Sequence, residues 1–218
     1  MSSQNIIITY LIMDPINQVI DENKFRIRLL AIAGSPRRGG NTDTLLNEAV
    51  AGAVLKGAMV KQIILSDLDI APCRHCDGCV ESGGTCVIDD DMQWIHQDLQ
   101  DYDRFIFAAP VFFMGIPSQA KAMIDRCQAL WAVKYVLNKP VATKPDILRK
   151  GSFISTAGST RKNTFSGSLA TVKSWFVTLD IAYSEGLFFK GFDNIQTAAH
   201  DRAAMQEAFM LGQNIISS

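Results

Sequence analysis

The order of apolar segments along the chain constrains the fold more than any other feature of the sequence. From Phe25 onward, short apolar runs alternate with longer segments whose apolar residues recur at helical spacing. This alternation is typical of a parallel β-sheet with helices on both faces. The expected strands are 28–33, 60–65, 105–109, 153–156 and 181–184. The first expected helix begins near residue 42, and the other four cover about 92–99, 120–131, 165–179 and 199–215.

Five strands that alternate with helices predict a flavodoxin-like α/β fold of three layers, with a five-stranded parallel sheet in the order 2-1-3-4-5. The chain has 218 residues, which favours a single domain over 1–218 rather than two small ones. Three segments lie outside the repeat: an N-terminal extension (1–23), a cysteine-motif loop (66–90) and an insertion (132–150). The first and third are candidates for contacts between subunits.

The charge balance excludes several classes of protein. Lys and Arg number 21 against 22 Asp and Glu, and 48% of the residues are hydrophobic. This composition argues against disorder, a coiled coil and a broadly basic nucleic-acid binder. No apolar run approaches the ~20 residues that a membrane helix needs, and the run 6–13 has no basic residue before it. We therefore expect a cytoplasmic protein with no nucleic-acid or membrane partner.

A glycine-rich loop, GSPRRGGNT over 34–42, joins the first strand to the first helix. Backbone N–H groups at a helix start, with hydroxyl, amide and guanidinium side chains beside them, can bind a phosphate. A nucleoside-triphosphate loop would need Lys at the position of Gly40, and the G-x-G-x-x-G fingerprint is absent, so a monophosphate such as that of FMN fits better. The alternative is an ordinary turn. The candidate phosphate-binding residues are Ser35, Arg37, Arg38, Gly40, Asn41 and Thr42, and Asn41 is also expected to cap the helix.

Three segments resemble the flavin loops of the NADPH-dependent FMN reductase family: GSPRRGGNT, APVFFMGIPSQAKAMIDR and STAGS. The resemblance implies that the first loop holds the FMN phosphate, the second lies along the isoalloxazine ring and the third closes over its other end. The second and third loops comprise Pro110, Val111, Phe112, Phe113, Met114, Gly115, Thr156, Ala157, Gly158 and Ser159. Gly40 stands where many relatives have a second Ser.

The second loop also fits this role by its own chemistry. Between Pro110 and Gly115 it offers an apolar wall with free backbone amides. Amides near the N1, O2 and N5 positions of a flavin stabilise the negative charge that reduction places there. The alternative is that Phe112 and Phe113 are core residues at a strand end.

Four of the five cysteines form the motif C-x2-C-x2-C-x6-C: Cys73, Cys76, Cys79 and Cys86. Three thiols at intervals of three, with the fourth returning through a Gly-Gly turn, suit a [4Fe-4S] cluster. Structural zinc, which usually takes two separated C-x2-C pairs, and free or disulfide-paired thiols are the alternatives. The motif is similar to that of the iron-sulfur flavoprotein branch of the same family. Cys127 is expected to be an inert buried thiol, and Arg126 a surface or packing residue.

These features predict an FMN-dependent oxidoreductase that moves electrons between NAD(P)H or a ferredoxin-type carrier and a small-molecule acceptor. No side-chain acid or base is required, so no catalytic residue is assigned. The cysteine segment follows strand two, so both sites are expected at the carboxyl edge of the sheet. The alternatives are an NAD(P)H-dependent FMN or quinone reductase without a cluster and a zinc-stabilised flavodoxin-like binding module without turnover. The resemblance also implies a homodimer or homotetramer.

Overall fold

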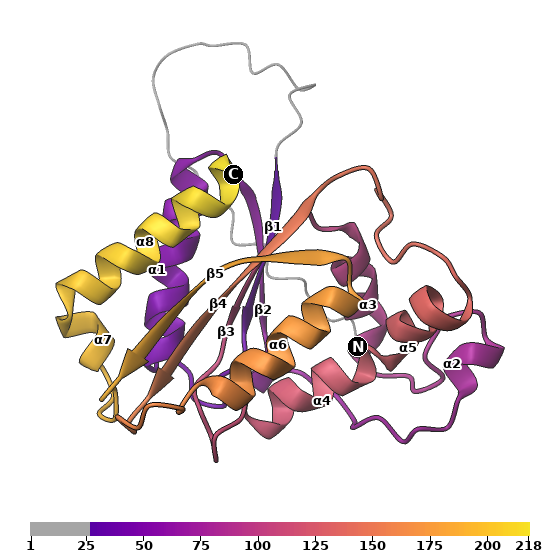
Figure 1. The fold of residues 1–218 in the computed structure, drawn as a ribbon, viewed down its shortest axis with the longest axis horizontal. Helices are drawn as coiled ribbons and strands as arrows, with labels where there is room; N and C mark the ends of the chain where they lie inside the picture. The colour runs from indigo at the N-terminus through magenta and orange to yellow at the C-terminus, as the bar shows by residue number, and fades with distance from the viewer. Residues whose placement is uncertain (1–26) are drawn as a thin grey trace, which may run out of the picture.

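A computed structural model describes residues 27–218, and the expected N-terminal extension lies outside them (Figure 1). The strands are β1 (Arg28–Ala33), β2 (Met59–Ile64), β3 (Arg104–Ala108), β4 (Arg149–Ala157) and β5 (Ile181–Lys190). The helices are α1 (Asn41–Leu55), α2 (Gly78–Glu81), α3 (Met92–Asp101), α4 (Ser118–Arg126), α5 (Gln128–Trp131), α6 (Ser166–Thr178), α7 (Thr197–His200) and α8 (Arg202–Ser217). The strands pair in parallel in the order β2-β1-β3-β4-β5, which confirms the predicted flavodoxin-like sheet.

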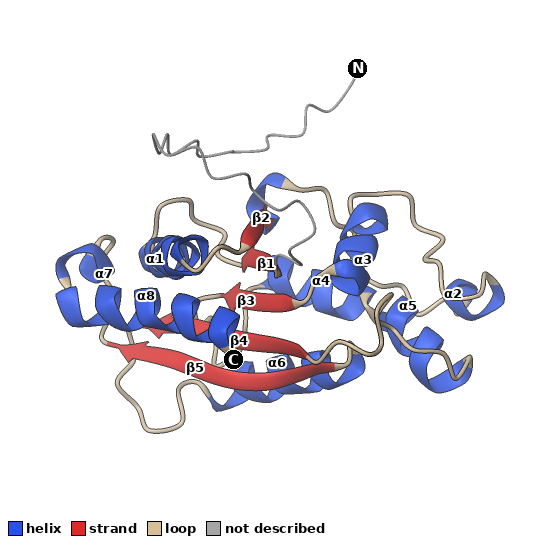
Figure 2. Ribbon diagram, turned by 90° about the horizontal axis from the view of Figure 1, so that it is seen from above, coloured by secondary structure: helices blue, strands red, loops and turns tan. Residues whose placement is uncertain are grey.

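The sheet is covered by different helices on its two faces (Figure 2). Successive side chains of a strand point to opposite faces, and β1 is buried on both. Leu29 and Ala31 pack in one apolar cluster with residues of α1 and α8. Leu30 and Ile32 pack in the other with residues of α3, α4 and α6. This double burial explains why β1 reads as an unbroken apolar run.

Helices α1 and α8 pack against each other through small residues. A Cβ atom added at Gly52 would lie 2.0 Å from the carbonyl oxygen of Phe209, and one added at Gly212 would lie 1.8 Å from that of Ala49. These distances are far below van der Waals contact, so both positions must be glycine for the helix backbones to approach this closely.

Several predicted boundaries differ from the structure. Strands β4 and β5 are longer than predicted, so residues 149 and 150 of the predicted insertion belong to β4. The predicted helix 120–131 is α4 followed by α5 and a π-helical segment, η2 (Ala132–Val136). The predicted helix 199–215 is divided into α7 and α8. In the rest of the insertion, Val141 and Ala142 are buried, which ties this segment to the domain.

Two buried arginines hold the amino edge of the sheet. Arg149, at the start of β4, donates to the carbonyl oxygens of Leu99, Tyr102 and Leu179, which lie at the ends of α3 and α6. Arg104, at the start of β3, donates to carbonyls at the end of α8. The guanidinium groups thus satisfy the unpaired carbonyls of helix C-termini, where positive charge is also favoured. Within residues 27–218, no helix is long and apolar enough to cross a membrane.

Candidate functional site

The three predicted flavin loops meet at the carboxyl edge of the sheet. They follow β1, β3 and β4, which are neighbours in the strand order. The backbone N–H of Gly34 donates to the carbonyl of Ala108 at 2.7 Å, and that of Val111 donates to Thr156 at 2.9 Å. The structure therefore brings together the three segments that the sequence grouped.

The glycine-rich loop folds through its own side chains. The Ser35 hydroxyl donates to the carbonyl of Arg37 at 2.9 Å and accepts from the N–H of the same residue at 3.1 Å. The Asp43 carboxylate accepts from the N–H of Gly39, which has a positive φ of 65°. Helix α1 then begins at Asn41, and its N-cap residue, Gly40, has no side chain to cap it. Its first N–H groups, which form no intrahelical bonds, are thus left for an anion.

Asn41 does not cap α1, and the predicted capping role is wrong. Its side-chain amide lies inside the first turn and donates to the carbonyls of Phe192 and Asn194, at 3.2 and 2.9 Å. Its Oδ1 accepts from the N–H of Ala198. These long-range bonds fix the segment after β5 against the start of α1, an alternative to local capping that the sequence pattern does not distinguish.

The other predicted phosphate residues differ in their surroundings. Arg37 is exposed and makes no ion pair among the described residues, whereas the exposed Arg38 pairs with Asp67 at 2.6 Å. Thr42 is buried within α1. Burial raises the pKa of Asp43, with Asp67 adding to this effect and the hydrogen bond from Gly39 and the charge of Arg38 opposing it. Of the two arginines in this loop, Arg37 is therefore the one without an ion-pair partner among the described residues.

The loop over 110–115, here called the ring loop, ends in a tight reverse turn. Phe112 and Gly115 exchange both backbone hydrogen bonds at 2.9 Å. The two residues between them, Phe113 and Met114, have positive φ values of 48° and 65°, which non-glycine residues seldom adopt. Phe112 is 48% exposed and Phe113 is fully exposed. The alternative that these two phenylalanines are core residues is therefore wrong.

The third loop is buried at its start and exposed at its end. Thr156 and Ala157 are buried at the end of β4, while Gly158 and Ser159 are exposed. A Cβ atom at Gly158 would lie 2.6 Å from Oδ1 of Asp193, so only glycine fits there without a shift of that carboxylate. The Ser159 hydroxyl accepts from the hydroxyl of Thr164 at 3.2 Å. The loop thus has a fixed course beside the ring loop.

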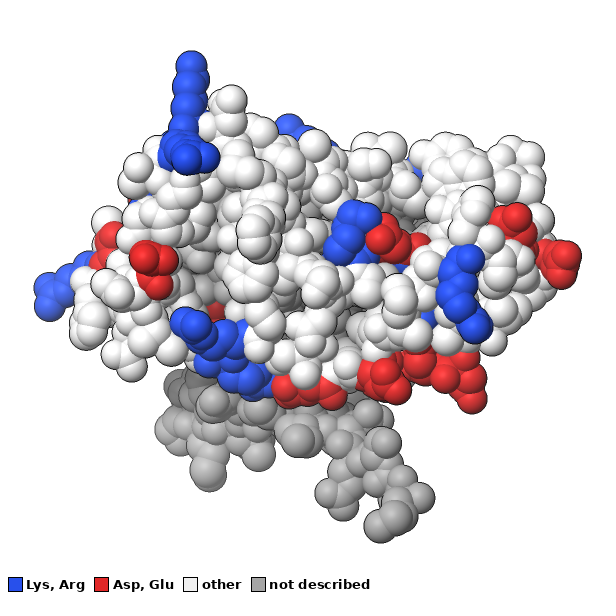
Figure 3. All heavy atoms as spheres, turned by 90° about the horizontal axis from the view of Figure 1, so that it is seen from below, with Lys and Arg blue, Asp and Glu red and all other residues white. Residues whose placement is uncertain are grey.

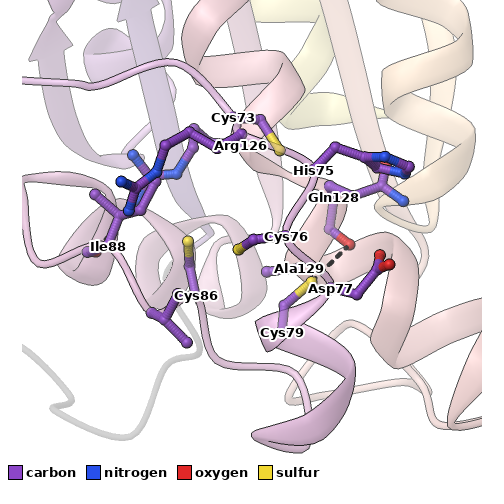
Figure 4. A pocket seen from close by; sticks show the side chains of 12 residues that line it. Cys73, His75, Cys76, Asp77, Cys79, Cys86, Ile88, Arg126, Gln128 and Ala129 are labelled. Carbon is purple, nitrogen blue, oxygen red and sulfur yellow. Dashed lines mark hydrogen bonds between the residues drawn. The ribbon is translucent and has the colours of Figure 1, made fainter.

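The four motif cysteines line one cavity, here called the cysteine cavity (Figure 4). Cys73, Cys76, Cys79 and Cys86 point into the same space, and the side chain of Arg126 lies beside them. Burial raises the pKa of Cys79, and the nearby Cys86, Cys73 and Cys76 raise it further. The thiols are close enough to affect one another electrostatically.

Unusual backbone angles fold the motif around this cavity. His75 and Asp77, which lie between the cysteines, have positive φ values of 50° and 56°. Each such residue costs about 1–2 kcal/mol, and strain of this kind concentrates at functional sites. The predicted Gly-Gly turn is present, because Gly83 and Gly84 both have positive φ and turn the chain back after α2. This turn returns Cys86 to the other three thiols.

A buried ion pair next to the cavity links the two ends of the cysteine motif. Arg126, at the end of α4, forms a two-pronged ion pair with Asp90 at 2.5 and 2.9 Å, and their side chains are 0% and 5% exposed. Arg126 also donates to the carbonyls of Ala71 and Ile88, which flank the cysteine motif on either side. Burial alone would raise the pKa of Asp90, but the bonds from Arg126, Ala71 and Met92 outweigh it and lower the pKa. The pair therefore holds the cavity in shape.

Of the two roles that the sequence suggested for Arg126, the structure contradicts the surface one, because the residue is buried and packs inside the domain. The helical spacing of Ala120, Met123 and Arg126 places the arginine on the buried face of α4, and this signal could have identified it. The prediction for Cys127 fits the structure: its thiol is buried, accepts from the indole N–H of Trp175 at 3.3 Å, and burial raises its pKa to about 12.

The cysteine cavity does not lie at the carboxyl edge, contrary to prediction. Helix α4 begins just after the ring loop and ends at Arg126 beside the cavity (Figure 1). Its 9 residues span about 13 Å, so the two sites lie at opposite ends of this helix. The segment after β2 runs away from the edge before the motif begins, which strand order alone does not reveal.

Comparison with known proteins agrees with this geometry. The sequence matches the NADPH-dependent FMN reductase family over residues 27–162. It is 30% identical over 149 residues to an iron-sulfur flavoprotein of Methanosarcina thermophila, which covers 68% of this chain and 72% of that protein. It is 37% identical over 107 residues to an iron-sulfur flavoprotein of Archaeoglobus fulgidus, covering 49% of this chain and about half (54%) of that protein.

The fold also has solved counterparts. An NAD(P)H:quinone oxidoreductase from Methanothermobacter marburgensis superposes with a TM-score of 0.65 at 14% identity, covering 87% of this chain and 98% of that one. A flavone reductase superposes with a TM-score of 0.64 at 21% identity, and the match covers 88% of this chain and 62% of that one. At these identities the likeness concerns the fold. Together with the sequence matches, it shows that this chain belongs to the NADPH-dependent FMN reductase family, in its iron-sulfur flavoprotein-like branch.

Proposed function

We propose that the protein is an FMN-dependent oxidoreductase that moves electrons between NAD(P)H or a ferredoxin-type carrier and a small-molecule acceptor. In this proposal FMN binds at the carboxyl edge and a [4Fe-4S] cluster is held by the four motif cysteines. The convergence of these four thiols on one cavity carries the proposal. When bound, the flavin exchanges hydride or single electrons and the cluster exchanges single electrons.

The carboxyl edge offers what a flavin mononucleotide needs. The uncapped start of α1 and the charge of Arg37 suit the phosphate. The exposed Phe112 and Met114 offer an apolar surface for the ring. Figure 3 views the molecule from this side and shows uncharged side chains over much of the face, with a basic and an acidic side chain side by side near its middle and further charges along its margins. The uncharged part of this face leaves room for a planar ring.

We favour a cluster over a single zinc ion because of the spacing that each would require of its ligands. A tetrahedral zinc ion needs its sulfur ligands about 3.8 Å apart, because each Zn–S bond is about 2.3 Å long. Within residues 27–218, no three Cys, His, Asp or Glu side chains lie close enough together to hold one ion. A [4Fe-4S] cluster is larger, and its four cysteine ligands lie farther from one another.

The spectrum and composition of anaerobically purified protein test the proposal. We expect flavin bands together with broad absorption near 400 nm, FMN as the only released nucleotide, and about four irons and four acid-labile sulfides per chain. Replacing any of the four motif cysteines with Ala should abolish or convert the cluster, whereas Cys127→Ala should not.

Other outcomes would favour the alternatives. Flavin bands alone, with four free thiols after strict anaerobic reconstitution, would favour an NAD(P)H-dependent FMN or quinone reductase without a cluster. Stoichiometric zinc without turnover would favour the binding module. Size-exclusion chromatography with light scattering tests the proposed homodimer or homotetramer.

A further inference from the structure

One buried donor in the cysteine cavity has no partner. The Arg126 guanidinium uses its two Nη atoms for Asp90 and for two backbone carbonyls, but its Nε–H has no hydrogen-bond acceptor within the described residues. The Arg126 side chain is completely buried and lines the cavity together with the four motif cysteines. A buried N–H without an acceptor is unfavourable by about 1–3 kcal/mol, so its retention points to an acceptor that is in place only when the cavity is occupied.

The candidate for that acceptor is the sulfur of Cys86. Both residues line the same cavity, and Figure 4 shows the Cys86 thiol pointing toward the side of the cavity where the Arg126 side chain lies. Cys86 is itself fixed by α3, because Gln93 donates to its carbonyl at 2.8 Å. The Arg126 guanidinium and the backbone of Cys86 are therefore both held in place beside the cavity.

We propose that Arg126 donates its Nε–H to the cluster-bound thiolate of Cys86 and thereby raises the reduction potential of the cluster. This inference rests on the cluster proposed above. Hydrogen bonds to cluster sulfurs and nearby positive charge both stabilise the more negative, reduced state. Asp90 holds the guanidinium in place through its two Nη atoms. Arg126 therefore acts as a positioning and potential-setting residue, not as a ligand.

The effect is measurable as a redox equilibrium. In Arg126→Gln, which removes both the charge and the directed donor, we expect the ratio of reduced to oxidised cluster at a fixed potential to fall about tenfold, equivalent to a midpoint lower by about 59 mV for one electron. Arg126→Lys keeps the charge but not the rigid fork, so it should restore only part of the shift. Midpoints are read by potentiometric titration with the EPR signal of the reduced cluster.

A matched control separates this local effect from net charge. Lys121→Gln removes a positive charge from the exposed side of the same helix, where Lys121 pairs with Asp125. This variant should leave the midpoint unchanged. An unchanged midpoint in Arg126→Gln with a full complement of iron, or full restoration by Lys, would overturn the hydrogen bond.

A second measurement does not depend on whether the Arg126 variants fold or bind iron. In protein grown with ¹⁵N-arginine and carrying Arg74→Lys, because Arg74 lies within the motif, pulsed EPR of the reduced cluster should detect a weak ¹⁵N coupling. Absence of this coupling in iron-loaded protein would refute the proposal. Absence of iron from the unmodified protein would instead refute the cluster, so the two failures are distinguishable.

Discussion

At the scale of single residues, the charge of the glycine-rich loop resides in two arginines with different partners. Arg37→Ala is expected to weaken FMN binding about ten- to a hundredfold, because it removes a charge-assisted phosphate contact of about 1.5–3 kcal/mol. Arg38→Ala is the matched control, since Arg38 already pairs with Asp67 and should have a smaller effect. Fluorescence titration of apoprotein with FMN measures both. Equal losses in the two variants would argue against the distinct role of Arg37.

His96 makes the cysteine region sensitive to acid. Its Nε2 lies 3.0 Å from the carbonyl of Arg126, and burial lowers its pKa from 6.5 to about 4. Because the unfolded chain takes up this proton at a higher pH than the folded chain, stability is present above pH 6.5 and falls as the pH drops toward 4. The loss is expected to approach about 3 kcal/mol.

Urea unfolding of wild type and His96→Gln between pH 7 and pH 4 checks this prediction. The variant should show a smaller decrease in unfolding free energy over that range, whatever its stability at pH 7. Parallel pH profiles would mean that His96 is not the group responsible.

Some residue roles were accessible from sequence and others were not. The four cysteines and the buried thiol of Cys127 followed from spacing and helical periodicity. The ion pair of Asp90 with Arg126 joins residues 36 positions apart, and such a contact depends on how α4 packs against the motif. The bonds of Asn41 to residues 192–198 could not be predicted from the sequence for the same reason. Local preference describes what a side chain can do, while tertiary contacts decide which partner it takes.

At the scale of helices, the close contact between α1 and α8 depends on the glycines Gly52 and Gly212. Gly212→Ala should destabilise the protein by about 1–3 kcal/mol, because its Cβ would press on the carbonyl of Ala49 and force the helices apart. Asn214→Ala, an exposed change on the same helix, is the control and should be nearly neutral. Thermal unfolding followed by circular dichroism compares them. An equally stable Gly212→Ala protein would show that the helices separate without loss.

Element types were easier to predict than element boundaries. All five strands were expected from their apolar runs, and β1, β3 and β4 are buried on both faces as such runs predict. The extension of β5 to Lys190 was missed, since its residues are mostly half-buried and mix polar with apolar side chains. The break between α4 and α5 was missed because both carry the same apolar periodicity through Cys127.

At the scale of the whole molecule, contacts within the chain tie the cysteine cavity to the rest of the domain. Arg126 bonds to Asp90 and to the carbonyls on either side of the motif, and none of these bonds involves a cysteine thiol. Chelation of iron is therefore expected to leave the helical circular-dichroism signal intact. The melting temperature should fall, because a group bound only by the native state stabilises it.

Anaerobic calorimetry of loaded and iron-free protein measures that difference. Cys127→Ala, loaded in the same way, serves as a control for the loss of a thiol that lies outside the cavity. If the iron-free protein loses its helical signal, the cavity depends on metal for folding, as zinc fingers do.

The packing of α8 on α1 also sets an order of events during synthesis on the ribosome. About 150 residues separate the end of α1 from the start of α8, which takes roughly 7–30 s at 5–20 residues per second. During this interval the small-residue face of α1 lacks its partner and is open to chaperones or to misassembly. The cysteine motif, Asp90 and Arg126 have all left the ribosome well before α8 is made. The part of the nascent chain that forms the cysteine cavity can therefore be complete while the opposite face of the sheet still lacks its last helix.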